Sequence, residues 1–134
     1  MKIAVRFHTR SGNTKRLAEA AAQAAGVTAE SVSVPLGEKV DILFLGSSVY
    51  GGKPDTEVTN FINANADKIG KIVVFGSTAL KRSTLGKIKE EAAKYGVTVC
   101  DMEFSCPGSF MFLHKNRPND QDCEKLKAFV KGLI

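Results

Sequence analysis

Short polar residues with spacing suited to anion binding cluster near the N-terminus. Residues 8–14 read HTRSGNT, between an apolar run (3–7) and an alanine-rich run (15–25), which predicts a strand followed by a helix. Because the first amides of a helix lack internal acceptors and carry partial positive charge, this junction favours phosphate. The side chains that can donate hydrogen bonds there are Thr9, Ser11, Asn13 and Thr14, and Gly12 lets the backbone curve around a ligand. The alternative is a plain turn in which one of them caps the helix.

A second segment with ligand-binding character follows the apolar run 42–45. Residues 46–54 read GSSVYGGKP, so Tyr50 stands beside two glycines. An aromatic residue next to glycines suits a flat ring that stacks on the side chain while the backbone approaches its edge. The alternative is a surface loop with an exposed tyrosine. A third polar segment, residues 77–83 (STALKRS), follows the apolar run 72–75.

The elements that must position these segments alternate along the chain. The expected strands are residues 2–7, 31–34, 41–47, 71–76 and 97–104, the last of them an edge strand. Four helices are expected: the first spans residues 14–25 and ends at Gly26, and the second is capped by Asp55. The third begins at Ser83 or Thr84 and is lined by Leu85, Ile88, Ala92 and Tyr95. The fourth begins at Pro118-Asn119-Asp120, and its inward residues are Cys123, Leu126, Phe129, Val130 and Leu133. Residues 35–39 are too few for a regular crossover helix and predict a turn or a single helical turn. The alternation predicts a single α/β domain with a doubly wound, five-stranded parallel sheet, helices on both faces, and a ligand beyond the carboxyl ends of the strands.

Composition limits the classes of protein. The chain has 134 residues, 43% of them hydrophobic and 25% charged, and no apolar run of membrane-spanning length. Three cysteines without a C-x-x-C pair, and no signal peptide, predict a cytoplasmic protein. The net charge of +5 would attract acidic proteins, but no basic run with interleaved aromatics predicts nucleic-acid binding.

Other doubly wound families need motifs that are missing here. Strand one does not end in the acidic pair of receiver domains, and no C-x5-R loop, P-loop, G-x-G-x-x-G or cobalamin D-x-H-x-x-G is present. His8 is expected at a solvent edge, and Cys106-Pro107-Gly108 is expected to form a turn. Cys106 and His114 lack the further partners that a metal site needs.

The spacing T-x-S-G-N-T over residues 9–14 resembles the [ST]-x-[ST]-G-N-T phosphate loop of the flavodoxin family. The resemblance implies the sheet order 2-1-3-4-5 and the cofactor FMN. Its phosphate would bind Thr9, Arg10 (at the variable position), Ser11, Gly12, Asn13 and Thr14. Its isoalloxazine ring would lie against Ser48, Val49, Tyr50, Gly51 and Gly52, and its pyrimidine edge against Ser77, Thr78 and Ala79.

The function that this resemblance implies is electron transfer between redox partner proteins by a monomer or homodimer, without nucleic acid or membrane. One alternative is an NAD(P)H-dependent flavin or quinone reductase, and a second is a flavin-free interaction or regulatory module. Well-known flavodoxins are acidic, whereas this chain is basic, which predicts a less negative potential for the second reduction step. The chain also lacks Trp, so ring stacking would depend on Tyr50, with a phenylalanine as a further candidate.

Overall fold

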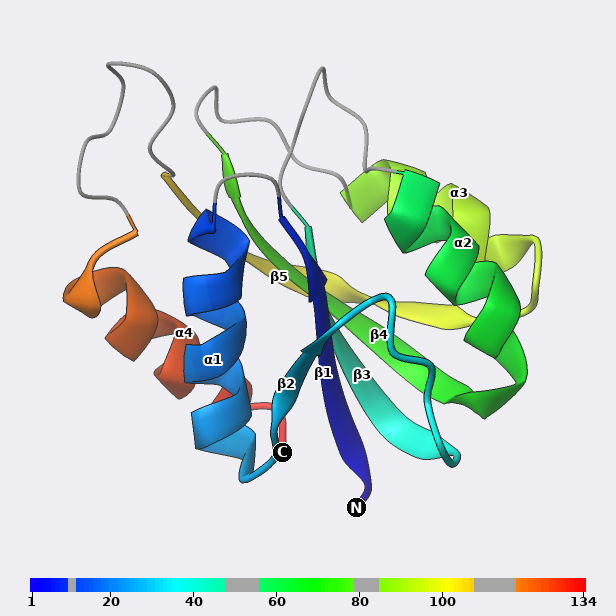
Figure 1. Ribbon diagram of the computed structural model, residues 1–134, viewed down its shortest axis with the longest axis horizontal. Helices are drawn as coiled ribbons and strands as arrows, with labels where there is room; N and C mark the ends of the chain where they lie inside the picture. The colour runs from blue at the N-terminus through cyan, green and yellow to red at the C-terminus, as the bar shows by residue number, and fades with distance from the viewer. Residues whose placement is uncertain (10–11, 48–55, 79–84, 108–117) are drawn as a thin grey trace.

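Five parallel strands form one sheet in the order β2-β1-β3-β4-β5 (Figure 1). The computed structural model describes residues 1–9, 12–47, 56–78, 85–107 and 118–134. The strands are β1 (Ile3–His8), β2 (Ala29–Ser31), β3 (Val40–Ser47), β4 (Ile69–Thr78) and β5 (Thr98–Pro107). The predicted α/β sheet, its order and its edge strand β5 are confirmed.

Among the described residues, two α-helices cover each face of the sheet (Figure 1). Helices α1 (Asn13–Ala25) and α4 (Asp120–Lys131) lie on one face, and α2 (Thr56–Asn65), followed by the short 3-10 helix η1 (Ala66–Lys68), and α3 (Leu85–Ala93) lie on the other. Within these described segments, no helix is long and apolar enough to cross a membrane.

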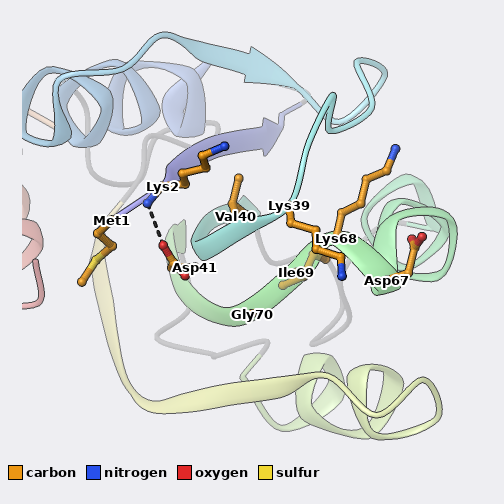
Figure 2. Close-up of a pocket in the computed structure, with 9 residues that line it drawn as sticks. All are labelled: Met1, Lys2, Lys39, Val40, Asp41, Asp67, Lys68, Ile69 and Gly70. Atoms are coloured by element: carbon orange, nitrogen blue, oxygen red, sulfur yellow. Dashed lines mark hydrogen bonds between the residues drawn. The ribbon is translucent and has the colours of Figure 1, made fainter.

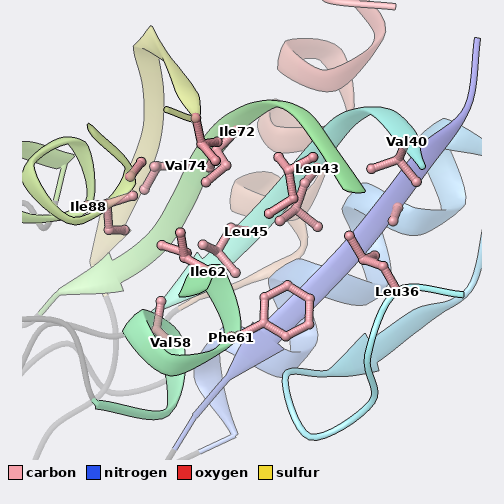
Figure 3. Packing of buried hydrophobic residues seen from close by; sticks show 14 residues of the cluster. Leu36, Val40, Leu43, Leu45, Val58, Phe61, Ile62, Ile72, Val74 and Ile88 are labelled. Carbon is pink, nitrogen blue, oxygen red and sulfur yellow. The ribbon is translucent and has the colours of Figure 1, made fainter. Parts of the chain in front are cut away.

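The apolar run in β3 is buried on both faces, as a central parallel strand requires. Leu43 and Leu45 face α2 and α3, with Ile62 beside Leu45, and Ile88 lies beside Val74 in the same buried cluster (Figure 3). Phe44 points to the opposite face, in the core beneath α1 and α4. The inner face of α1 is formed by Leu17, Ala18 and Ala21, which are fully buried, and Gly26 ends the helix as predicted, at φ +75°.

The connection from β2 to β3 contains no helix, as predicted, and side chains from elsewhere hold its peptide groups. Arg6 Nε donates to the carbonyl of Val34 at 2.9 Å, and Arg6 Nη2 donates to that of Pro35 at 3.3 Å. The Leu36 N–H donates to Asn65 Oδ1 at 3.0 Å, and its carbonyl accepts from Lys68 Nζ at 3.1 Å. These contacts replace the hydrogen bonds that a crossover helix would make within itself. Leu36 can therefore insert into the core (Figure 3).

Three local predictions were wrong. Strand β2 spans 29–31 rather than 31–34, because the chain turns after Ser31 and Val34 becomes exposed. Tyr95 does not line α3, since the helix ends at Ala93 and the turn to Gly96, at φ +73°, leaves the ring exposed. Cys106 and Pro107 belong to β5 rather than to a turn, and Cys106 is buried under α1 and α4.

Both edge strands are irregular or short. β2 has three residues, which pair with Val5, Arg6 and Phe7 of β1. In β5 the register shifts: Val99 pairs with Ile72, but Glu103 pairs with Val74. More residues of β5 than of β4 span this interval, so the edge strand bulges in its middle.

Candidate functional site

The carboxyl ends of β1 and β3 meet beside the start of α1. His8, the last residue of β1, is in register with Ser47, the last residue of β3. The chain leaves β1 toward one face and β3 toward the other, so the strand order reverses between them (Figure 1). In parallel sheets this switch point is where ligands bind.

The first turn of α1 has the features of an anion-binding helix start. Gly12 precedes the helix at φ +88°, a left-handed conformation that favours glycine. Its N–H donates to Thr9 Oγ1 at 3.0 Å, which joins the residue that follows β1 to the start of α1. As an acceptor, the Thr9 hydroxyl keeps its own hydrogen for donation. No acidic residue occupies the first turn, so the positive end of the helix dipole is not neutralised there.

Small and buried residues lie beneath this turn. Thr14, Ser47 and Ser77 are all buried, with 0%, 2% and 4% of their surface exposed. The ring of Phe75 and the methyl group of Thr14 fill the space that a side chain at Gly46 would need. The floor of the site therefore combines hydroxyl groups from α1, β3 and β4 with a closely packed apolar base.

Two ion pairs flank the same edge. His8 Nε2 lies 3.8 Å from Glu57 Oε2 in the first turn of α2, an attraction that requires a protonated imidazole. Arg16 of α1 donates to the carbonyl of Pro118 at 2.6 Å and pairs with Asp120 of α4. Neither pair was predictable from the sequence, because the partners are far apart in it and no spacing signal connects them.

The predicted site residues divide into two sets. Thr9, Gly12, Asn13 and Thr14 lie together at the start of α1, and Ser77 and Thr78 end β4. The others lie outside the described residues: Arg10, Ser11, Ser48, Val49, Tyr50, Gly51, Gly52 and Ala79. The helix cap predicted at Asp55 and the helix opening predicted at Ser83 or Thr84 also lie outside them.

A hollow of about 620 Å³ lies at the opposite end of the sheet from the candidate site (Figure 2). Lys2, Lys39 and Lys68 line it together with Asp41 and Asp67. Asp41 Oδ2 already accepts from the backbone N–H of Lys2 at 2.7 Å. This hollow faces the amino ends of the strands, and its charges are mixed, so we place the candidate site at the carboxyl ends. Across the described segments, no cluster of three or more His, Cys, Asp or Glu residues could hold a metal ion.

Comparisons with known proteins agree with this fold. An uncharacterized protein of Methanocaldococcus jannaschii is 25% identical over 116 residues, which is 78% of this chain and 77% of that protein. A flavodoxin structure from the domain Archaea superposes with a TM-score of 0.77 at 23% identity, covering 99% of this chain and 96% of the other. A flavoprotein from Lactobacillus acidophilus in complex with FMN has a TM-score of 0.62 at 15% identity, covering 78% of this chain and 91% of the other. Residues 4–99 match the family model described as a flavodoxin domain, so the chain belongs to the flavodoxin domain family and is a flavodoxin-like flavin protein.

Proposed function

We propose that the protein binds FMN at the carboxyl edge of the sheet and carries electrons between redox partner proteins. The observation that carries this proposal is the start of α1. It combines Gly12 at positive φ, a Thr9 hydroxyl that accepts a hydrogen bond from the Gly12 N–H, and a first turn without acidic residues. A helix start of this kind favours a phosphate group. The complex of the Lactobacillus flavoprotein with FMN supports the choice of this flavin.

In this proposal three connections of the chain each bind a different part of the FMN molecule. Thr9, Gly12, Asn13 and Thr14 would hold the phosphate, with Arg10 and Ser11 from the same segment. Ser48, Val49, Tyr50, Gly51 and Gly52 would lie against the ring, and Ser77, Thr78 and Ala79 would bind its pyrimidine edge. The flavin would supply the redox chemistry, while these residues bind it, orient it and set its electrostatic surroundings.

The charge distribution along the sequence supports acidic redox partners. Residues 10–11, 48–55, 79–84 and 108–117, which follow β1, β3, β4 and β5, contain six of the 19 Lys and Arg residues but one of the 14 Asp and Glu residues. The rest of the chain therefore holds 13 basic and 13 acidic residues, and the excess of +5 belongs to these connections. A concentrated excess of one sign accelerates association with a partner of the opposite sign, and salt weakens the effect.

The same excess supports a less negative potential for the bound flavin than acidic flavodoxins have. Positive charge favours the added negative charge of a reduced flavin. Potentiometric titration against reference dyes measures this property. A potential as low as that of an acidic flavodoxin would overturn this part of the proposal.

The first experiment is the absorbance spectrum of the purified protein, followed by fluorescence titration with FMN and riboflavin. Flavin bands, or sub-micromolar quenching of FMN with much weaker binding of riboflavin, are expected because the phosphate contributes much of the affinity. Failure to bind FMN would overturn the proposal. Rapid oxidation of NADPH or NADH by the FMN-loaded protein, followed at 340 nm, would instead assign it to reductase enzymes.

A further inference from the structure

We propose that Gly46 is a positioning residue for the phosphate, because its missing side chain sets how closely the first turn of α1 approaches the end of β3. This inference rests on the proposed binding of FMN at the start of α1. It concerns three described residues from three elements: Thr14 of α1, Gly46 of β3 and Phe75 of β4. None of the three is adjacent in sequence to the others.

The contacts around Gly46 leave no room for a methyl group. A Cβ atom there would lie 2.6 Å from both Cε2 and Cζ of Phe75 and 2.9 Å from Cγ2 of Thr14. Carbon atoms in favourable contact are about 3.5–4.0 Å apart, so even an alanine would force its neighbours to move. The backbone of Gly46 has no positive φ, so the requirement for glycine comes from space.

The two neighbours differ in how easily they can move. The Phe75 side chain is fully buried in the core beneath α1 and α4, where close packing opposes a change of ring position. Thr14 is also buried, but it lies in the first turn of α1, one residue after the helix begins. A bulkier residue at position 46 should therefore displace the start of α1 rather than the aromatic ring.

This displacement would act on the phosphate rather than on the flavin ring. The first turn of α1 presents helix amides and the side chain of Asn13, with Thr14 buried beneath them, whereas the ring would depend on connections after β3 and β4. A shift of the first turn weakens hydrogen bonds to phosphate, since these bonds depend steeply on distance and angle. Gly46 should thus determine the preference for FMN over riboflavin, although its own side chain is a hydrogen atom.

The test compares Gly46→Ala with Gly86→Ala. Gly86 lies in α3, and a Cβ built there has no neighbour within 4 Å, so this control makes the same chemical change in open space. Gly46→Ala is expected to weaken FMN binding by about tenfold or more while changing riboflavin binding much less. Gly86→Ala is expected to leave both affinities unchanged. Equal losses for FMN and riboflavin, or no loss, would overturn the inference.

A second variant tests the mechanism. In Gly46→Ala/Thr14→Ser the Thr14 methyl is removed and its hydroxyl is kept, so FMN affinity should recover relative to Gly46→Ala alone. Persistent loss of the same size in the double variant would contradict the proposed contact. If Gly46→Ala alone does not fold, the inference requires the double variant to fold and bind FMN, and failure of both would count against it.

A readout without flavin separates this inference from the proposed function. In the ligand-free protein, amide NMR signals of the first turn of α1 should shift in Gly46→Ala, while those near Gly26 at its other end should stay. Wild-type protein that fails to bind FMN would overturn the proposed function alone, whatever the shifts. Unshifted first-turn signals in a folded variant would overturn the inference alone.

Discussion

Helices α1 and α4 pack side by side on one face of the sheet, yet they begin in opposite ways. At α4 the side chain of Asn119 accepts from the N–H of Asp122 at 3.0 Å, and the Asp122 carboxylate accepts from the N–H of Asn119 at 2.9 Å. This reciprocal capping box comes with two acidic residues in the first turn. At α1 the cap is Gly12, which has no side chain to offer, and the first turn has no acid.

The difference shows that acidic side chains of the protein compensate the positive end of α4, whereas the first turn of α1 contains none. The acids of α4 offset the positive end of its dipole, and Asp120 also pairs with Arg16 of α1. The start of α1 has no comparable compensation among its own first-turn residues, and basic residues follow at positions 15 and 16. An external anion would supply at α1 what Asp120 and Asp122 supply at α4.

The strongest test places an acid at the start of α1. Asn13→Asp should weaken FMN binding on the order of 100-fold, because the new carboxylate repels the phosphate at short range. The same change should raise the free energy of unfolding of the ligand-free protein by about 0.3–1 kcal/mol through the helix dipole. Fluorescence titration and urea denaturation measure the two effects.

Gln23→Glu is the matched control for this prediction. It adds the same charge to an exposed position in the last turns of the same helix. FMN affinity should stay within about twofold of wild type, since salt screens charges at this separation. An equal loss of affinity in both variants would show that net charge, rather than the helix start, governs binding.

The left-handed cap gives the second prediction. Gly12→Ala should lower the free energy of unfolding by about 1 kcal/mol, since alanine is strained at positive φ, and should weaken FMN binding about tenfold. Gly26→Ala places the same strain at the other end of α1, at φ +75°. Gly26→Ala should lower the free energy of unfolding by a similar amount and leave FMN affinity unchanged. Loss of affinity in Gly26→Ala would mean that helix stability alone limits binding.

The cap of α4 should matter only for stability. Asn119→Ala removes the acceptor for the Asp122 N–H and should lower the free energy of unfolding by about 1 kcal/mol, without changing FMN affinity. Asn63→Ala, at an exposed position in α2, should change stability by less than about 0.5 kcal/mol. A loss of FMN affinity in Asn119→Ala comparable with that of Asn13→Asp would remove the distinction between the two helix starts.

The smallest effect concerns the contact between the two helices. Burial raises the pKa of the Cys123 thiol on α4, and Arg16 of α1 acts in the opposite direction. Alkylation by iodoacetamide should therefore be slower at pH 8 than for a free thiol, and slower still in Arg16→Gln, because less thiolate is present. Peptide mass spectrometry can follow Cys123 separately from Cys100 and Cys106. A faster reaction in Arg16→Gln would show that Arg16 protects the thiol by covering it.

The sheet and the start of α1 were predictable because their signals are local. The apolar run over residues 42–45 identified a central strand, and T-x-S-G-N-T identified the loop before α1. The start of α4 at Asn119 was equally predictable from the sequence, since the two capping residues are three positions apart. These features depend on neighbours in sequence, so one segment is enough to predict each of them.

The errors and omissions have long-range causes. Val32 and Val34 look like strand residues, but Arg6 binds the carbonyl of Val34 from another strand and holds the chain in a turn. The space around Gly46 depends on Phe75 and Thr14, both about 30 residues away in sequence. Likewise, the pairing of Arg16 with Asp120 spans 104 positions. No periodicity or motif in a single sequence encodes such contacts.

The irregular edges of the sheet have a consequence for behaviour at high concentration. An exposed, regular strand edge is a template for another chain, and stacking through such edges leads to fibres. Here one edge offers three residues in β2, and the other is interrupted by the register shift in β5. Neither edge offers a long, regular row of backbone groups with which a strand of a neighbouring molecule could pair. A crowded solution of this protein should therefore stay dispersed, and any dimer should form through helices or connections rather than through a continuous intermolecular sheet.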